Sequence, residues 1–304
     1  MADCISFFNG DWIPTEECKL DVFDRGLLMG DAVFDVARTY NGKPFKIERH
    51  FERMQRSLKY ARLDIGMTMD EFGKIIIEAV ERNQKHIPEV GDLIIWFFAT
   101  RGKGPWAWSA GPPAIGCRIA PVDFARYATE FSTGAHGVIT KAKSHAPGTV
   151  EPKVKHYTRM NFAMAELEAN DVVPGGWPIM PDHEGNITEG TINNVFLVSN
   201  GTIKTATDKS ILQGISRSVV FDLANQLNIP IVEEDLQPYD LYTADEAFFS
   251  FTGPGVLPMT KVDHREVGSG EIGPVVSQLI AAWSENVGVD IVDQAQKFGS
   301  RAWP

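Results

Sequence analysis

The sequence predicts an α/β protein of two domains. With 304 residues, 43% of them hydrophobic, the chain is long enough to form two hydrophobic cores rather than one. Short β-rich runs and segments with helical periodicity both recur along its whole length. We therefore expect an N-terminal α/β domain over residues 1–120, a linker over 121–132 and a larger C-terminal domain over 133–304, which carries Lys155.

The N-terminal domain is expected to begin with two hairpins. Asn9-Gly10 and Asn41-Gly42 each separate two β-rich runs, and Asn-Gly supplies the positive φ angles of a tight turn. Helices are predicted over 48–61 and 69–80, where apolar residues recur every three or four positions. Strands are predicted over 93–100 and 114–120, and the Gly-, Pro- and Trp-rich stretch 102–113 between them is expected to be a loop.

The C-terminal domain is expected to alternate strands with helices. Patterning predicts strands over 137–140, 194–199 and 247–251, and helices over 159–168, 215–227 and 274–285.

Composition limits the kind of partner and the location. The formal net charge of −11 repels a phosphate backbone, so we expect no nucleic-acid partner, and an anionic ligand would need a local basic pocket. The first residues lack a basic stretch followed by an apolar run, and the longest apolar segments are too short to cross a bilayer. The three cysteines have no metal-ligand spacing. We therefore expect a cytoplasmic protein without a metal site or membrane contact.

Two glycine-containing segments could bind phosphate. Residues 268–273 match the spacing of a dinucleotide-binding loop but lack the βαβ context, so we interpret them as a turn. Gly214 directly precedes the predicted helix 215–227, whose first N–H groups could bind a phosphate with the Ser216 hydroxyl beside them. Taken alone, however, Ser216 is favoured as a simple helix cap.

Three charged residues indicate a functional site only when they are considered together. Lys155 lies in the segment 151–157, where strand alternation would place it on one face with Lys153, although a lone lysine is usually exposed. Arg53 lies on one helical face with Arg49, where an arginine is usually solvated. Glu189 precedes the predicted strand 194–199, so its carboxylate could face a pocket or lie in a solvated turn.

Taken in order from residue 6 to residue 274, these segments resemble the class IV aminotransferases. Residues 25–35 are similar to the early active-site strand of that family, and residues 50–57 to its helix with the phosphate-binding arginine, here Arg53. The resemblance makes Lys155 the Schiff-base lysine and Glu189 the partner of the pyridine nitrogen. The other cofactor-binding residues that it suggests are Arg159, Gly214, Ile215, Ser216, Thr252 and Gly253.

The resemblance implies a fold type IV enzyme, a homodimer whose pyridoxal 5'-phosphate (PLP) lies at the domain interface. The chemistry of PLP explains the residue types. Lys155 must attack the aldehyde as an unprotonated amine, so it needs a lowered pKa, which burial and a cation such as Arg53 or Arg159 could supply. A carboxylate at the ring nitrogen lets the ring accept electrons, and the freed lysine can carry the proton from the substrate Cα.

The expected substrate pocket departs from the family patterns. D-amino-acid transaminases carry an Arg-X-His pair after a Thr-Arg-Gly turn to bind the substrate carboxylate, whereas here Thr100-Arg101-Gly102 is followed by Trp106-Ala107-Trp108. Two indoles would form a flat apolar wall, or they would pack the loop down. The candidate pocket residues are Phe34, Arg101, Lys103, Trp106 and Trp108. A cation must also meet the carboxylate of the oxo-acid acceptor, for which Arg101, Lys103 and Arg126 are candidates.

The branched-chain pattern is also incomplete. Met160 stands where those enzymes place a tyrosine, and Pro254 has no N–H to donate to a carboxylate. These differences favour an (R)-selective amine transaminase, which moves an amino group from a primary amine or amino acid to a 2-oxo acid by a ping-pong mechanism. The alternatives are a branched-chain or D-amino-acid aminotransferase, a PLP lyase resembling aminodeoxychorismate lyase, and a non-catalytic PLP carrier.

Overall fold

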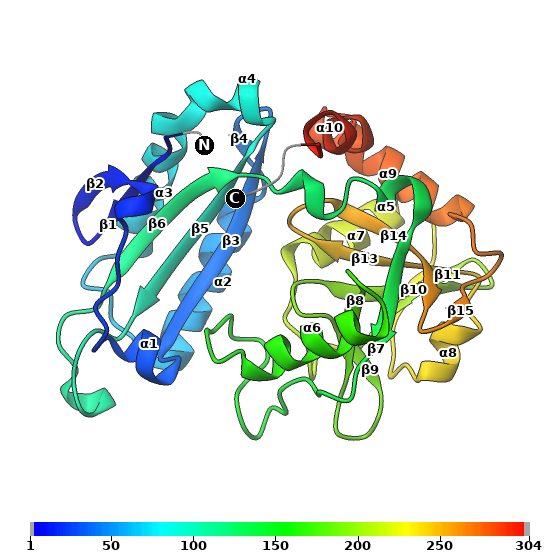
Figure 1. The fold of residues 1–304 in the computed structure, drawn as a ribbon, viewed down its shortest axis with the longest axis horizontal. Coiled ribbons are helices and arrows are strands. Elements are labelled where there is room, and N and C mark those ends of the chain that lie inside the picture. The colour runs from blue at the N-terminus through cyan, green and yellow to red at the C-terminus, as the bar shows by residue number, and fades with distance from the viewer. Residues whose placement is uncertain (1–2, 301–304) are drawn as a thin grey trace. The chain divides into compact units, whose positions relative to one another are not determined.

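The computed structural model describes residues 3–300 of the chain (Figure 1). Tertiary contacts divide it into a first unit, Met1–Val122 with Val154–Arg159, and a second unit, Asp123–Lys153 with Met160–Pro304. Lys155 thus belongs with the first unit, although we expected it in the C-terminal domain. The reason is local, because the N–H of Phe34 donates to the carbonyl of Lys155 at 2.9 Å and Val33 forms an antiparallel bridge with His156.

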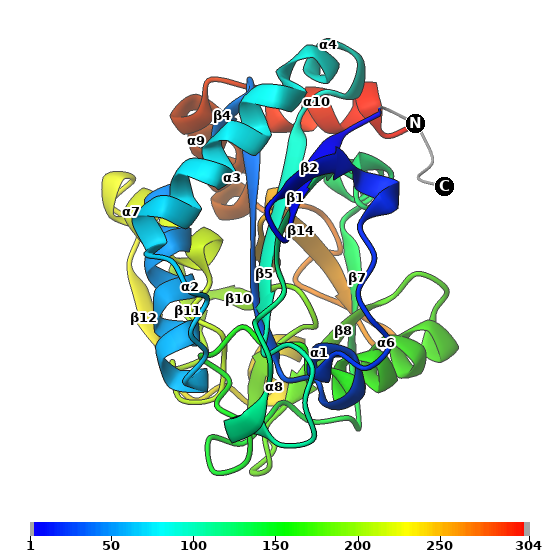
Figure 2. The ribbon, with the colours of Figure 1, turned by 90° about the vertical axis from the view of Figure 1, so that its left-hand side faces the viewer.

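The first unit is a six-stranded antiparallel sheet with two helices on one face, α2 (Ile47–Ala61) and α3 (Met69–Asn83) (Figure 2). The strand order is β2-β1-β6-β5-β3-β4. These strands span Ile5–Phe8 (β1), Asp11–Pro14 (β2), Ala32–Tyr40 (β3), Lys43–Pro44 (β4), Leu93–Thr100 (β5) and Ile115–Pro121 (β6). Both predicted hairpins are confirmed, with Asn9 and Asn41 at φ 49° in their turns.

One continuous hydrophobic core joins the helices of the first unit to its sheet. Apolar residues of α2 and α3 meet those of β5 and β6, among them Met54, Phe72, Ile76, Ile95 and Cys117, all fully buried. The helix predicted over 69–80 extends to Asn83. The side chain of Asn83 ties this helix to β1, since its amide donates to the Ile5 carbonyl at 2.7 Å and accepts from the Ile5 N–H at 2.8 Å.

The second unit is built on a sheet that closes on itself. Its strand order is β12-β11-β10-β13-β14-β7-β8-β9, and β9 pairs with β10 as well as with β8. The strands are Ala135–Ile139 (β7), Trp177–Pro181 (β8), Ile187–Glu189 (β9), Asn194–Ser199 (β10), Thr202–Thr205 (β11), Ile231–Glu233 (β12), Glu246–Phe251 (β13) and Gly255–Val262 (β14), with β15 (Arg265–Glu266) beside β14. The β9–β10 pairing makes a barrel, and its register sets Glu189 directly opposite Asn194.

In the part of the second unit that the structure describes, six helices accompany the barrel: α5 (Glu130–Thr133), α6 (Met160–Val172), α7 (Ile215–Gln226), α8 (Pro238–Tyr242), α9 (Pro274–Val287) and α10 (Ile291–Phe298). The three long helices that the sequence predicted, here α6, α7 and α9, are confirmed to within a few residues at each end. Strands β8, β9, β11, β12 and β14 and helix α10 were not predicted.

Two kinds of feature are absent from residues 3–300. None of the helices described there is both long and apolar enough to cross a membrane. Within the same residues, no group of three or more His, Cys, Asp and Glu side chains is placed to hold a metal ion.

Candidate active site

Lys155 is fixed against β3 and α2 of the first unit. Its backbone N–H donates to the Oγ of Ser57 at 3.3 Å, and its Nζ lies 4.8 Å from the centroid of the Phe34 ring. The segment around Lys155 is not assigned as a strand, and its β-pairing is the isolated bridge between His156 and Val33. The strand interpretation, which placed Lys153 and Lys155 on one face, is therefore wrong. Contacts with neighbouring elements, rather than strand alternation, set the direction of Lys155.

Three aromatic rings form a stack beside Lys155. Phe34 stacks on Trp96 with centroids 5.1 Å apart and lies 4.4 Å from the ring of Tyr157. The indole N–H of Trp96 donates to the Tyr157 hydroxyl at 2.6 Å. Burial raises the pKa of Tyr157 to about 12, so it remains a neutral phenol at physiological pH. Arg159 also approaches this aromatic stack, with its guanidinium carbon 5.8 Å from the Phe34 centroid.

Arg53 lies buried on the face of α2 that meets β3. Its Nε and one terminal nitrogen donate to the two oxygens of Asp35, each at 2.8 Å, and the Nδ1 of His50 lies 2.7 Å from the same carboxylate. The expectation that such an arginine is solvated is therefore wrong, because Asp35 compensates its charge. Sequence reasoning assigned no role to Asp35, although a carboxylate inside an apolar strand was a signal for one.

The charges in this cluster are balanced. Burial acts to raise the pKa of Asp35, but Arg53 and His50 outweigh it and hold that pKa well below its usual range. Burial lowers the pKa of His50 despite the opposing effect of Asp35, and the nearby charges of Arg53 and Lys155 lower it further. His50 is therefore neutral at pH 7, with its Nδ1–H donating to Asp35. The charge of Arg53 is paired with that of Asp35, at 2.8 Å.

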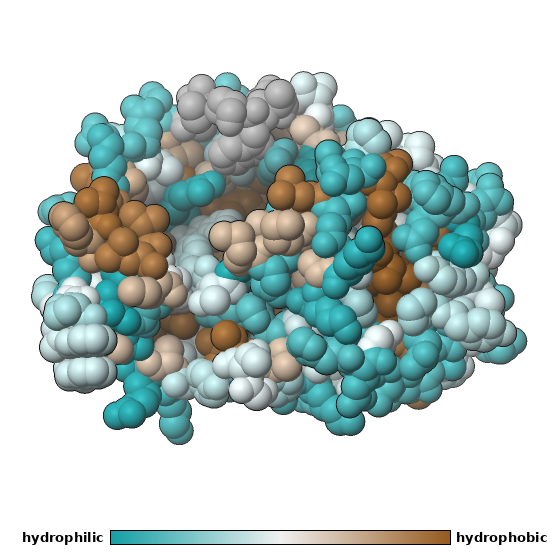
Figure 3. Space-filling view, turned by 60° about the horizontal axis from the view of Figure 1, so that its bottom comes forward, coloured by the Kyte–Doolittle hydropathy of each residue, from teal (hydrophilic) through white to brown (hydrophobic). Residues whose placement is uncertain are grey.

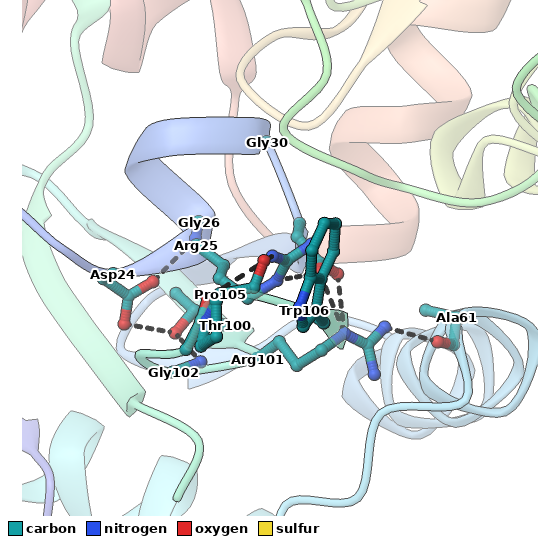
Figure 4. A network of polar contacts seen from close by, with 12 residues as sticks. Asp24, Arg25, Gly26, Gly30, Ala61, Thr100, Arg101, Gly102, Pro105 and Trp106 are labelled. Atoms are coloured by element: carbon teal, nitrogen blue, oxygen red, sulfur yellow. Dashed lines mark hydrogen bonds and ion pairs between the residues drawn. The ribbon is translucent and has the colours of Figure 1, made fainter. Parts of the chain in front are cut away.

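Arg101 and Lys103 are engaged within the first unit. Arg101 donates from Nε to both oxygens of Asp31, at 2.9 and 3.0 Å, and from a terminal nitrogen to the Ala61 carbonyl at 2.7 Å (Figure 4). Arg25 donates to the same Asp31 carboxylate at 2.9 Å. Lys103 pairs with Asp21 at 3.0 Å. Arg101 therefore ties the turn after β5 to the C-terminal end of α2.

Trp106 and Trp108 stack on each other in the loop over 102–113. Their rings are parallel to within 1°, with centroids 5.3 Å apart. Trp108 is 82% exposed and Trp106 is 58% exposed. Such exposure contradicts the alternative in which the two indoles pack the loop down onto the core. The pair instead presents a flat apolar surface.

Glu189 is the last residue of β9 in the second unit. Its Oε2 accepts from the N–H of Leu212 at 2.9 Å and from the side-chain amide of Asn194 at 3.4 Å. Glu189 is 6% exposed, so the alternative of a solvated turn residue is wrong.

The N-terminus of α7 carries the predicted phosphate-binding turn. Gly214 is its N-cap residue and no side chain of residues 3–300 caps the helix, so the interpretation of Ser216 as the cap is wrong. The N-terminus of α9 differs, because the Glu246 carboxylate accepts from the N–H groups of Val275 at 3.0 Å and Val276 at 2.8 Å. The Gly-rich residues 268–273 lead into this occupied end, which supports their interpretation as a turn.

Thr252 and Gly253 follow β13 in the second unit. A Cβ on Gly253 would lie 2.9 Å from the ring of Tyr127, so the close approach of that ring favours glycine at this position.

The candidate residues thus form two groups. Lys155, Arg53, Phe34 and Arg159 gather in the first unit, where Arg101, Lys103, Trp106 and Trp108 occupy the loop after β5. Glu189 and the turn before α7 are linked in the second unit, which also carries Thr252 and Gly253. Asp35, Trp96, Tyr157 and Asn194 join these groups although the sequence did not single them out.

Comparison with known proteins assigns the family. The model of the class IV aminotransferases matches residues 32–262, so the chain belongs to this family and is a PLP-dependent transferase. The family expected from the sequence motifs, and its fold, are therefore confirmed.

Similar proteins carry two different substrate names. The chain is 32% identical to a D-alanine aminotransferase of Staphylococcus haemolyticus over 90% of its length and 94% of that protein. It is 31% identical to a protein of Methanocaldococcus jannaschii assigned as a branched-chain-amino-acid aminotransferase, over 90% and 93% of the two chains. Among solved structures, it resembles the branched-chain aminotransferase of Thermoproteus uzoniensis with a TM-score of 0.81 and 25% identity, over 97% of each chain.

Proposed function

We propose that this chain transfers an amino group from a primary amine or amino acid to a 2-oxo acid, with a preference for (R)-amine donors. The observation that carries the proposal is the surroundings of Lys155, whose amine lies 4.8 Å from the Phe34 centroid within the aromatic stack. In a transaminase the lysine amine acts at the substrate Cα, so groups beside it contact the substituents of that carbon. An aromatic surface there favours apolar substituents.

The donor set fits PLP group by group. Lys155 supplies an amine for the aldehyde, and the buried Glu189 supplies a carboxylate for the ring nitrogen. The N-terminus of α7, left uncapped by the side chains that the structure describes, supplies N–H groups at Ile215 and Ser216 for the phosphate. We propose that Arg53, Thr252 and Gly253 complete the phosphate site and that Arg159 adds positive charge near it.

The protein residues divide the work of transfer. Bound PLP accepts the electrons released at the substrate Cα. Lys155 would take the proton from that carbon as a general base and deliver it to the C4' carbon of the cofactor as a general acid, while the Glu189 carboxylate would hold a proton on the ring nitrogen. The phosphate-binding residues keep the cofactor in place while its bond to Lys155 is exchanged.

The loop over 102–113 supports the preference for amines over D-amino acids. Trp106 and Trp108 present a flat, exposed apolar surface where D-amino-acid enzymes carry their Arg-X-His carboxylate trap. We propose that these indoles, with Phe34, accept an apolar substituent, and that Arg101 or Lys103 meets the acceptor carboxylate. A branched-chain donor is the second candidate, because the Thermoproteus uzoniensis enzyme, solved with norvaline, shares the fold.

Replacing Lys155 tests the cofactor assignment. Lys155→Ala should abolish both activity and the visible absorbance of lysine-bound PLP, because the amine assigned to the aldehyde is lost. Lys153→Ala is the matched control, two residues away and in the second unit, and should leave both unchanged. A Lys155→Ala protein with the wild-type spectrum would contradict the assignment.

A donor screen tests the substrate proposal. Both enantiomers of 1-phenylethylamine, valine and alanine would be offered with pyruvate or 2-oxoglutarate, and product amino acid measured. We expect the fastest amino transfer from (R)-1-phenylethylamine. Faster transfer from L-valine would establish the branched-chain alternative. Faster transfer from D-alanine would establish the D-amino-acid alternative. Turnover of the donor without amino transfer to the oxo acid would indicate a lyase. A change in the PLP spectrum on addition of amines, without turnover, would indicate a non-catalytic carrier.

We also propose that the protein is a cytoplasmic homodimer. Helix α1 (Arg25–Met29) and the residues before it expose Val22, Phe23, Leu27, Leu28 and Met29, each more than half exposed. Figure 3 shows hydrophobic surface, in brown, on the face that it brings forward. Such a concentration of apolar side chains is typical of a protein–protein interface. All three cysteines are free thiols, which suits a reducing compartment.

A further inference from the structure

Asn194 lies at the seam that closes the barrel of the second unit. It is directly opposite Glu189 in the β9–β10 pairing, so the two side chains project from the same face of the sheet. Its amide nitrogen donates to the Oε2 of Glu189 at 3.4 Å and to the Leu212 carbonyl at 3.1 Å. The N–H of Leu212 donates in turn to the same Oε2 at 2.9 Å. The carboxylate, the asparagine and residue 212 therefore form a closed set of hydrogen bonds.

The same side chain explains why residue 214 is a glycine. The backbone of Gly214, at φ −63° and ψ 137°, suits any amino acid, so its dihedral angles do not require glycine. A Cβ at this position would, however, overlap the Oδ1 of Asn194. The next neighbour, the Cβ of Arg217, would be 3.2 Å away. Asn194 thus fills the space that a side chain on residue 214 would need.

We propose that Asn194 is a positioning residue that holds the Glu189 carboxylate and the turn over residues 212–214 as one piece. This inference rests on the proposed function, in which Glu189 meets the ring nitrogen of PLP and the turn before α7 binds its phosphate. The two groups must be held at a distance that matches the rigid cofactor. Asn194 is 4% exposed and is hydrogen-bonded both to Glu189 and to the Leu212 carbonyl, so it fixes that spacing before the cofactor binds.

The first test removes the asparagine and observes the cofactor rather than turnover. With PLP labelled with 15N in its ring, Asn194→Ala should shift the ring-nitrogen signal toward the unprotonated form at neutral pH. It should also raise the dissociation constant of PLP roughly tenfold, since a hydrogen bond to a charged group is lost. Asn194→Ser, which retains a hydroxyl, should give a smaller change in both and serves if the alanine variant does not fold.

Asn193→Ala is the matched control for this experiment. Asn193 is the neighbouring residue and is 5% exposed, but its side-chain amide makes no hydrogen bond to any part of the chain that the structure describes. Its removal should leave the ring-nitrogen signal in place. A wild-type ring signal and wild-type PLP affinity in Asn194→Ala would overturn the proposal, as would equal changes in Asn193→Ala.

A double-mutant cycle tests the link to the turn. Gly214→Ala alone should weaken PLP binding roughly tenfold, because the new methyl group displaces the Asn194 side chain and its hydrogen bonds to Glu189 and Leu212. In the Asn194→Ala background that space is open, and the second substitution should have little further effect. Strictly additive losses would refute the coupling. Failure of the proposed function is separate, because it would appear as a wild-type protein without lysine-bound PLP.

Discussion

One buried carboxylate, Asp35, organises the polar face of α2. It accepts two bonds from Arg53 and one from His50, and it is fully buried. Asp35→Asn would leave Arg53 as a buried cation without its partner, and breaking such a pair costs about 3–5 kcal/mol. We expect that loss in the free energy of unfolding, measured with urea on the PLP-free protein. A loss below about 1 kcal/mol would contradict the proposed charge balance.

His50 should make stability depend on pH. Its pKa is lower in the folded protein than the ordinary value of about 6.5, so the unfolded chain binds its proton more readily. Above about pH 6.5, His50 is neutral in both states and its protonation does not affect the free energy of unfolding. As the pH falls from there toward the pKa of His50 in the folded protein, the free energy of unfolding decreases by at most about 1.4 kcal/mol per pH unit. His50→Gln, which can still donate to Asp35, should make the unfolding free energy less dependent on pH below about pH 6.5. An unchanged slope would exclude His50 as its source.

At this scale the sequence indicated the charged residues but not their partners. Lys155, Arg53 and Glu189 lie in motifs that can be recognised along the chain. Asp35 and Asn194 acquire their roles through contacts with residues 18 and 5 positions away, which depend on helix packing and strand register. No local periodicity records those contacts, so the hydrogen-bonding partners could not be derived from the sequence.

Two helix N-termini of the second unit should respond differently to mutation. Glu246 caps α9, whereas no described side chain caps α7, where Ser216 is the second residue. Glu246→Ala should lower the unfolding free energy by about 1–2 kcal/mol and leave PLP affinity unchanged. Ser216→Ala should weaken PLP binding roughly three- to tenfold and leave the stability of the PLP-free protein unchanged. Titration with PLP would measure the affinity, and titration with urea would measure the unfolding free energy. Weaker PLP binding in Glu246→Ala, or lower stability in Ser216→Ala, would refute the assignment of α7 as the phosphate-binding helix.

Elements with strong local patterns could be predicted, and those that depend on long-range pairing could not. The Asn-Gly turns of the hairpins and strands β5 and β10 lie where the sequence placed them. Strand β8 contains two prolines, and β9 and β12 have three residues each, so none of them has enough alternation to detect. Segment 121–132, expected to be a linker, contains a 3-10 turn at Phe124–Arg126 and the start of α5.

At the scale of the whole molecule, closure of the barrel is the feature that the sequence did not reveal. It depends on β9 pairing with both β8 and β10. In the β9–β10 pairing, Glu189 lies opposite Asn194 across a short turn. Val154–Arg159 lies far along the chain from the rest of the first unit, yet bonds to β3. Sequence order therefore did not predict which unit holds Lys155.

The exposed apolar side chains of α1 provide the test of assembly. Hydrogen bonds hold this helix at both ends. At its start, the N–H of Gly26 donates to the Asp24 carboxylate at 2.7 Å, and Arg25 donates to the carboxylate of Asp31, which follows the helix, at 2.9 Å. Its apolar side chains are therefore presented outward at little entropic cost on association. Replacing both Leu27 and Leu28 with Glu should convert a dimer to a monomer in light scattering after gel filtration, since each subunit would bury unpaired charges.

Tyr239→Glu is the control for that experiment, because Tyr239 is 72% exposed, comparable with the 60% of Leu27, but belongs to α8 of the second unit. A general effect of surface charge would act on both variants, whereas an interface through α1 would affect the leucine variant alone. Dissociation in both variants would indicate non-specific destabilisation. A wild-type protein that is monomeric at micromolar concentration, or a leucine variant that remains dimeric, would show that α1 does not form the interface.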